Sequence, residues 1–273
     1  VRDADAYIIR GAESSFMVDA LPEGSKTFLD SLDLVSERRQ GQDSAERSLA
    51  FLTKEQEIEI FSRFTQVICI QEDEAELASQ WIGRERVVTA KHPVEPTKNL
   101  PRGHRTRIGM VASDWPPNAY GIRDFVVNCW PRIRQAGATL DVYGKVNKAL
   151  NASLPAVTFH GYVDDLNDCY ARLGMAINPV QYGAGLKIKS IEAMARGLPL
   201  VTSREGASGI VHLDGKALVI ADTWDDFTDQ IMALMKDEDR CLTLASNAVK
   251  HVSEHFNEEA CFSDLRDRIE NCA

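Results

Sequence analysis

Short apolar runs alternate with helix-like segments along this chain, and many of the runs are bounded by glycine or proline. The runs "QVICI" at residues 66–70, "RIGMVAS" at 107–113 and "GMAINPV" at 174–180 are typical of buried strands. Helical patterns, such as those at residues 73–81 and 186–196, separate them. This alternation predicts an α/β fold whose parallel sheets carry helices on both faces.

One segment breaks the alternation. Residues 91–105, "KHPVEPTKNLPRGHR", contain three prolines and mixed charge, which is typical of a linker. We therefore expect two Rossmann-like units, a short one over residues 1–95 and a larger one over 96–255. A C-terminal helix over 256–273 is expected to pack back on the first unit.

Charge and hydropathy exclude several classes of protein. The net charge of −10 disfavours general nucleic-acid binding, although local basic pockets for small anions remain compatible with it. No apolar run approaches the roughly 18 residues of a membrane span. We find no signal-peptide pattern, and because the chain opens with Val1 we expect position 1 not to be a natural start. Six scattered cysteines favour reduced thiols and a cytoplasmic setting over a disulfide framework.

The stretch "YGAGLKIKSIEAMARGLPLV", residues 182–201, leaves a strand and enters a helix. Gly183 and Gly185 allow close approach of the backbone to a ligand. Lys187 is expected in the first helical turn, where a cation opposes the helix dipole, and an anionic ligand would explain it. Glu192 lies two turns in, where its carboxylate could bind a pair of sugar hydroxyls. From spacing alone, an anion site and an ordinary solvated helix end are equally supported.

Other strand ends carry similar chemistry. Ligands of such sheets bind outside the carboxyl ends of the strands, and this rule also selects the loop "TSREGASG" at residues 202–209. The loop "YGKVNK" supplies Gly144, Lys145 and Lys148, with a plain polar loop as the equal alternative.

Together these stretches resemble the GT-B glycosyltransferases, specifically the group 1 family (family 4, retaining). The likeness is most specific over residues 156–210 and includes "YGAGLKIKSIEAMARGLPLVTSREGASGI", "IGMVASDWPPNAYGIRDFV", "LDVYGK" and "FHGYVDDLNDCYARLGMAINP". The resemblance implies a GT-B type fold with two Rossmann-like units, of which the N-terminal one is incomplete.

The resemblance also implies a donor site and a role for each part of it. Glu192 matches a ribose-binding glutamate, residues 183–187 match the loop that meets the diphosphate and the sugar, and Lys187 and Glu192 are the residues implied in catalysis. The base would meet backbone groups of Tyr162 and Val163. The implied donor-site residues are Ser113, Asp114, Gly144, Lys145, Tyr162, Val163, Gly183, Ala184, Gly185, Leu186, Lys187 and Glu192.

The activity implied is transfer of a sugar from a nucleoside diphosphate sugar, with retention, to a glycan or lipid-linked acceptor. It needs no metal and no cofactor besides this donor. The expected location is cytoplasmic, with room for peripheral contact at the inner membrane face.

Two departures from the family keep alternatives open. Ala184 stands where many members carry a glutamate that touches the transferred sugar, and the first unit is shorter than a complete acceptor domain. Both favour a non-catalytic transferase-like subunit that binds a partner enzyme. A sugar-nucleotide epimerase is a further alternative, but it would need an acid–base pair that the sequence does not display.

Four further signals are discounted. His251 and His255 fit a zinc motif, but no third ligand is apparent. The carboxylates of Asp3 and Asp5 precede their strand and are expected in solvent. Residues 38 and 39 are arginines that fit an ordinary surface, and His160 is expected to pack.

Overall fold

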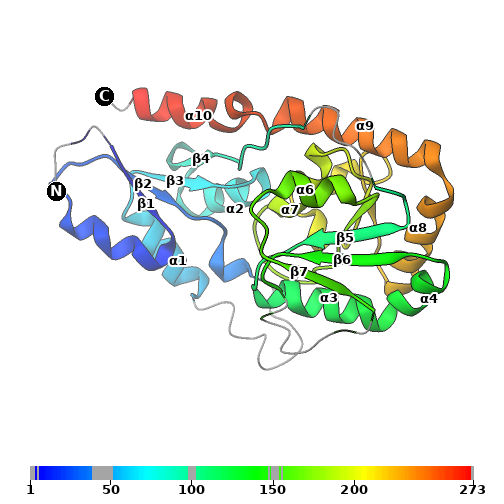
Figure 1. Ribbon diagram of the computed structural model, residues 1–273. Coiled ribbons are helices and arrows are strands. Elements are labelled where there is room, and N and C mark those ends of the chain that lie inside the picture. Colours follow the sequence, from blue (N-terminus) through cyan, green and yellow to red (C-terminus); the bar gives the residue numbers. More distant parts are fainter. Residues whose placement is uncertain are drawn as a thin grey trace. The chain divides into compact units, whose positions relative to one another are not determined.

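The computed structural model describes residues 4, 6–38, 52–97, 103–146, 148, 154 and 156–271 (Figure 1). The chain forms two compact units. Unit 1 comprises Val1–Pro93, Gly183–Leu186 and Phe256–Ala273, and unit 2 comprises Val94–Tyr182 and Lys187–His255. Each unit contains its own sheet, and every strand pairing in both sheets is parallel, which confirms the α/β prediction.

The sheet of unit 1 has four strands in the order β1-β2-β3-β4. They are β1 (Tyr7–Arg10), β2 (Thr27–Asp30), β3 (Gln66–Cys69) and β4 (Val87–Thr89). The register pairs Ile9 with Leu29, Leu29 with Val67, and Val67 with Val87. Because side chains alternate along a strand, this row lies on one face of the sheet, and the buried Phe28, Ile68 and Val88 lie on the other.

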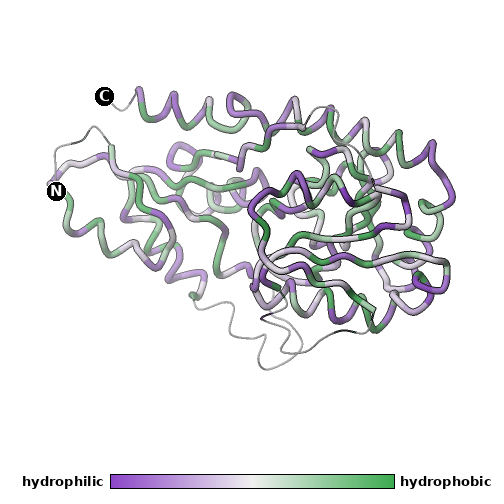
Figure 2. Tube along the Cα trace, in the orientation of Figure 1, coloured by the Kyte–Doolittle hydropathy of each residue, from purple (hydrophilic) through white to green (hydrophobic). Residues whose placement is uncertain are grey.

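Helices cover both faces of the unit 1 sheet. The face with Leu29 and Val67 packs in one cluster with residues of α1 (Lys54–Ser62) and α2 (Glu72–Ile82), such as Phe61 and Ala78. The face with Phe28 packs against Leu265 and Ile269 of α10 (Glu258–Glu270). Figure 2 shows the apolar strands between helices whose outer faces are polar.

The sheet of unit 2 has six strands in the order β10-β9-β8-β5-β6-β7. They are β5 (Arg107–Val111), β6 (Thr139–Tyr143), β7 (Thr158–Gly161), β8 (Met175–Asn178), β9 (Leu200–Thr202) and β10 (Val219–Ile220). The chain runs outward from β5 to β7 and then returns to β8 on the other side of β5. The strand order therefore reverses between β5 and β8, which is where such sheets bind ligands.

Helices of unit 2 pack in one core cluster with apolar side chains of its sheet (Figure 1). The cluster contains side chains of α3 (Pro116–Asn128), α4 (Trp130–Gln135), α8 (Trp224–Lys236) and α9 (Glu238–His255). Within it, Phe125 of α3 and Phe227 of α8 meet edge to face, with their ring centroids 5.5 Å apart. The described part of this unit also contains α6 (Leu166–Arg172) and α7 (Ile188–Ala195).

The helix boundaries differ from the sequence prediction at two places. Residues Ala12–Ala20 form a 3-10 helix that the apolar pattern did not indicate. The sequence pattern predicts a helix over about residues 120–135, whereas helix α3 begins at Pro116. Proline is favourable in the first turn because its missing N–H would have had no partner there. The apolar pattern also predicts a helix over residues 43–64, and the first part of this segment lies outside the described residues.

The structure also describes the cysteines and the apolar character of the helices. The five cysteines in the described part of the chain are buried and free of disulfides. Among the described residues, no helix has the length and apolar character needed to cross a membrane.

One helix cap gives a simple test of the fold. Thr223 precedes α8, and its side chain accepts a hydrogen bond from the backbone N–H of Asp226 at 3.1 Å. Thr223→Ala should therefore lower the free energy of unfolding by about 1 kcal/mol, measured by urea denaturation. Thr243→Ala is the matched control, because the Thr243 hydroxyl bonds only within α9. A loss in the control as large as that in Thr223→Ala would contradict the capping role.

Candidate functional site

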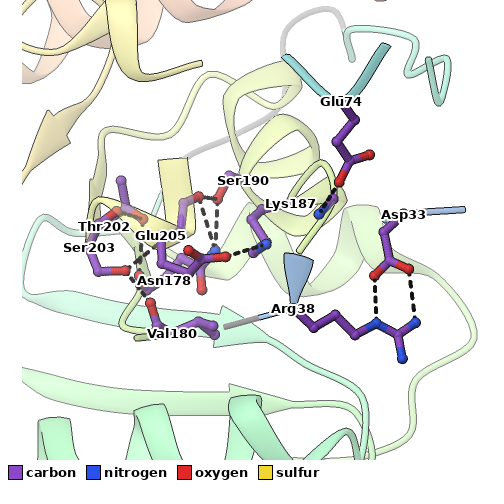
Figure 3. A network of polar contacts seen from close by, with 12 residues as sticks. Asp33, Arg38, Glu74, Asn178, Val180, Lys187, Ser190, Thr202, Ser203 and Glu205 are labelled. Atoms are coloured by element: carbon purple, nitrogen blue, oxygen red, sulfur yellow. Dashed lines mark hydrogen bonds and ion pairs between the residues drawn. The ribbon is translucent and has the colours of Figure 1, made fainter. Parts of the chain in front are cut away.

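The candidate site of unit 2 lies where β5 and β8 leave the sheet. A buried polar network joins the ends of β8 and β9 to α7 (Figure 3). Asn178, at the end of β8, donates from Nδ2 to Ser190 Oγ at 2.9 Å, and Ser190 Oγ donates to the Gly206 carbonyl at 2.7 Å. The Thr202 hydroxyl donates to the Asn178 carbonyl at 3.0 Å. These bonds fix the direction in which α7 leaves the sheet edge.

Lys187 precedes α7 at its N-cap position, one residue before the first turn where we expected it. Its side chain is only 4% exposed, and its Nζ lies 2.8 Å from Glu205 Oε1, whose side chain is 12% exposed (Figure 3). Lys187 is thus held in a buried ion pair and is not a solvated cation. Glu205 belongs to the loop after β9 that the strand-end rule had selected, although its pairing with Lys187 was not predicted.

Lys189 is the second cation of this helix end, and its sequence position fits either a supporting role in anion binding or a solvated side chain. Its Nζ donates to Asn118 Oδ1 at 2.5 Å, and Asn118 Nδ2 in turn donates to the carbonyl and the hydroxyl of Ser113, both at 3.2 Å. Burial, and next the neighbouring charge of Lys187, lower the pKa of Lys189 to about 7, although the charge of Glu192 acts in the opposite direction. The structure therefore brings Ser113, predicted as a site residue, together with Lys189 through Asn118.

Glu192 lies on α7, one turn beyond Lys189. Its Oε2 accepts a long hydrogen bond of 3.4 Å from the hydroxyl of the buried Tyr170 in α6. Burial, and next the charge of Glu192, raise the pKa of Tyr170 well above its usual range. Tyr170 therefore stays protonated and donates to Glu192, which helps to orient the carboxylate.

The loops after β6 and β7 lie next to each other. Gly144 adopts φ 94°, and a Cβ there would lie 2.2 Å from the Ala112 carbonyl oxygen, so only glycine fits. Its N–H donates to the Gly161 carbonyl at 2.7 Å. Lys145 Nζ lies 5.4 Å from the centroid of the Tyr162 ring, which is 68% exposed. An exposed aromatic ring beside a lysine thus stands at the carboxyl edge of this sheet.

Several remaining predictions have a defined place in unit 2. Asp114 is exposed in the loop after β5, and Val163 is half-buried after β7. His160 packs as expected: its ring stacks on Tyr143 at 4.3 Å, and its Nε2 lies 2.6 Å from Asp141 Oδ1.

A third imidazole, that of His212, lies beside the two histidines of the zinc motif, but the described residues form no metal site. His251 contacts the rings of both His255 and His212, with centroids 4.5 and 5.6 Å apart. Nevertheless, the described part of the chain contains no group of three or more metal-ligating side chains that could hold an ion.

The glycine loop itself, residues Gly183–Leu186, belongs to unit 1. There the Gly185 N–H donates to Glu74 Oε1 at 2.9 Å (Figure 3). Asp33 and Arg38, in the loop after β2, form a two-pronged ion pair, with 2.9 Å between Arg38 Nη2 and Asp33 Oδ1 and 3.1 Å between Nε and Oδ2. Arg38 is therefore held in place and is not a free surface arginine, while residue 39 lies outside the described residues.

Comparison with known proteins identifies similar sequences. Residues 105–237 match the family model "Glycosyl transferases group 1", in agreement with the predicted resemblance to group 1 glycosyltransferases over this part of the chain. A curated relative from the cps region of Klebsiella pneumoniae, an uncharacterized 44.6 kDa protein, is 23% identical over 222 residues, 76% of this chain and 56% of that protein. The D-inositol 3-phosphate glycosyltransferase of Corynebacterium kroppenstedtii is 29% identical over 92 residues, 33% of this chain and 20% of that protein.

Solved structures show the same fold at low sequence identity. TarM superposes with a TM-score of 0.75 at 17% identity, covering 97% of this chain and 55% of TarM. HepE of Anabaena, in complex with UDP, gives a TM-score of 0.67 at 16% identity, covering 97% of this chain and 78% of HepE. Sucrose-phosphate synthase of Thermosynechococcus elongatus gives a TM-score of 0.69 at 17% identity, covering 97% of this chain and 74% of the synthase.

These likenesses confirm the predicted GT-B type fold, in which the N-terminal sheet is the smaller one. The chain spans about half the length of the Klebsiella relative and of TarM.

Proposed function

We propose that this chain forms the donor-binding part of a glycosyltransferase that transfers a sugar from a nucleoside diphosphate sugar to a glycan or lipid-linked acceptor, with retention of anomeric configuration. The observation that carries the proposal is the half-buried Lys189 at the N-terminal end of α7, tied through Asn118 to Ser113 at the reversal point of the sheet. The match of residues 105–237 to a glycosyltransferase family supports it.

The proposed chemistry is electrostatic. As the glycosidic bond of the donor breaks, negative charge develops on the departing diphosphate while the sugar gains oxocarbenium character. Lys189 and the backbone N–H groups at the start of α7 provide positive charge for that anion without needing to reorganise. Tyr162 and Val163 are proposed to meet the base, and Glu192 is proposed to bind the ribose hydroxyls.

UDP is the first nucleotide to test, because the solved structures of HepE carry UDP, and in other cases UDP-glucose or UDP and glucose. Calorimetric titration of the chain with UDP, GDP and ADP should give binding of one of them. Failure of all three nucleotides to bind to folded protein would contradict the proposal.

Glu192→Ala is expected to weaken nucleotide binding by about 10- to 150-fold, since a carboxylate that binds hydroxyls contributes about 1.5–3 kcal/mol. Its effect on stability should be small, because the bond from Tyr170 is long. Tyr170→Phe removes the same bond from the other side and leaves the carboxylate in place. If Tyr170→Phe weakens binding as much as Glu192→Ala does, the effect arises from packing and the ribose role is wrong.

A non-catalytic subunit that binds a partner enzyme is the second candidate. Two observations favour it: Ala184 offers no carboxylate to the transferred sugar, and the charge of Lys187 is already paired with Glu205. Donor turnover by the full-length protein, measured as release of nucleoside diphosphate with acceptor present, distinguishes the two. Turnover supports the transferase, and its absence with intact nucleotide binding supports the subunit.

A further inference from the structure

A buried carboxylate of unit 1 holds the glycine loop. Glu74 lies in the first turn of α2 and is only 7% exposed. Its Oε1 accepts a hydrogen bond from the Gly185 N–H at 2.9 Å and a longer one, 3.5 Å, from the Leu34 N–H. Hydrogen bonds to a charged acceptor are roughly twice as strong as neutral ones. One side chain thus ties the loop after β2 to Gly183–Leu186.

The shape of the loop at this point is independently constrained. Gly185 adopts φ 72°, and a Cβ there would lie 3.0 Å from Asp33 Cβ and 3.5 Å from the Leu32 carbonyl oxygen. Leu32 itself has φ 65°, a conformation that is uncommon for a residue with a side chain and persists only when its surroundings enforce it. Close packing and the Glu74 bond therefore act on the same two segments.

We propose that Glu74 is a positioning residue for donor binding: it fixes the amide of Gly185 and thereby the course of the loop that leads into Lys187 and α7. The inference rests on the proposed function, in which the start of α7 receives the diphosphate. Two glycines within four residues give this loop many alternative conformations. A loop ordered in advance does not incur that entropy cost when the ligand binds.

Glu74 acts through Gly185 and not on the donor itself. Its carboxylate is buried and already accepts from backbone N–H groups, and a second negative charge beside a diphosphate would repel it. If Glu74 lay beside the diphosphate, removing its charge would strengthen binding. If Glu74 positions the loop, its loss weakens binding.

Glu57 provides a matched control in the same unit. It is fully buried and accepts from the N–H groups of Val35 at 2.7 Å and Ser36 at 3.0 Å, and from the Ser36 hydroxyl at 2.5 Å. Like Glu74 it stabilises the loop after β2, but within the described residues its hydrogen bonds go to Val35 and Ser36 and not to residues 183–186. Glu57→Ala should therefore reproduce the cost of losing a buried carboxylate without the effect on Gly185.

The test compares Glu74→Ala, Glu74→Gln and Glu57→Ala by two measurements. Amide hydrogen exchange in the ligand-free protein reports directly on the Gly185 N–H. Calorimetric titration with UDP then measures how each substitution changes the affinity for the nucleotide. Glu74→Ala should speed exchange at Gly185 and weaken UDP binding about tenfold, equivalent to roughly 1.4 kcal/mol. Glu74→Gln keeps an acceptor oxygen and should restore most of the exchange protection at Gly185 and most of the affinity for UDP. Glu57→Ala should leave the protection and the affinity close to those of the wild type.

The outcomes separate this inference from the proposed function. If the wild type does not bind UDP, GDP or ADP while Glu74→Ala still speeds exchange at Gly185, the proposed function fails, and with it the donor role of Glu74. If the wild type binds UDP and Glu74→Ala binds it equally well or more tightly, the proposed function stands and the positioning role is overturned. Equal losses in Glu74→Ala and Glu57→Ala would also overturn it.

Discussion

Replacing Lys187 by alanine is expected to lower the free energy of unfolding by about 3–5 kcal/mol, because it leaves the Glu205 carboxylate without its cation in a buried position. The Lys187 ammonium and the Glu205 carboxylate are 2.8 Å apart and almost wholly removed from solvent. A charge in such a place loses most of its hydration, and the partner charge offsets that loss. Urea denaturation of the wild type and the variant measures the difference.

The double variant Lys187→Met with Glu205→Gln separates the ion pair from other effects of the change. With both charges removed, neither an ammonium nor a carboxylate is left buried alone, so the double variant should regain most of the stability that either single variant loses. Strictly additive losses would show that the two groups are not coupled and that Glu205 finds another partner. Lys236→Met, an exposed lysine in the same unit, should change the free energy of unfolding by less than about 0.5 kcal/mol.

The strands could be predicted because their signal is local. Runs such as "QVICI" and "GMAINPV" are mostly apolar, and a strand covered on both faces requires this wherever it lies in the sheet. The 3-10 helix Ala12–Ala20 could not be predicted in the same way. Only Ala12 and Ser15 of its residues are buried, so its sequence carries little of the apolar periodicity that marks an amphipathic helix.

The candidate site was predicted in its location but not in its pairings. Glycine, lysine and the strand-end rule together indicated the loop before α7 and the loop after β9. Which lysine meets which partner depends on the direction of each side chain, and residues two apart on a helix point to different sides. Lys187 therefore reaches Glu205, while Lys189 reaches Asn118. No local pattern joins Lys189 to a residue 71 positions earlier in the chain.

The pairing of Glu74 with Gly185 illustrates the same limit. The two residues are 111 positions apart, and Glu74 stands in an acidic first turn, "EDE", which by itself only indicates a favourable helix start. Residue spacing alone cannot show which of the three carboxylates in this turn faces the loop and which two are exposed to solvent. Only the fold identifies it.

Lys189→Met is expected to weaken UDP binding by up to about 100-fold at pH 7, since a hydrogen bond between charged groups contributes about 1.5–3 kcal/mol. The same comparison with Lys236→Met should show no change, because that lysine is exposed at the end of α8. Calorimetric titration gives both values. Unchanged affinity in Lys189→Met would remove this lysine from the donor site.

The pH dependence gives a second and independent test of Lys189. Its pKa is about 7 in the ligand-free protein, and a bound diphosphate would raise it by favouring the ammonium. Above pH 7 UDP binding must therefore take up a proton, and affinity for UDP should fall about tenfold between pH 7.0 and 8.5. The phosphate of UDP is already ionised over this range, since its last pKa is about 6. Lys189→Met should show a flat profile.

Stability should respond to pH with the opposite sign. In the unfolded chain Lys189 keeps its proton up to about pH 10.5, whereas in the folded protein it loses the proton near pH 7. Between these values the unfolded state binds more protons, so the free energy of unfolding rises with pH, by at most about 1.4 kcal/mol per unit. From pH 7.0 to 8.5 the ligand-free wild type should gain stability relative to Lys189→Met while it loses affinity for UDP. A titrating group elsewhere would be shared by the two proteins and would cancel in this comparison, so opposite slopes that disappear in Lys189→Met can arise only from this ammonium.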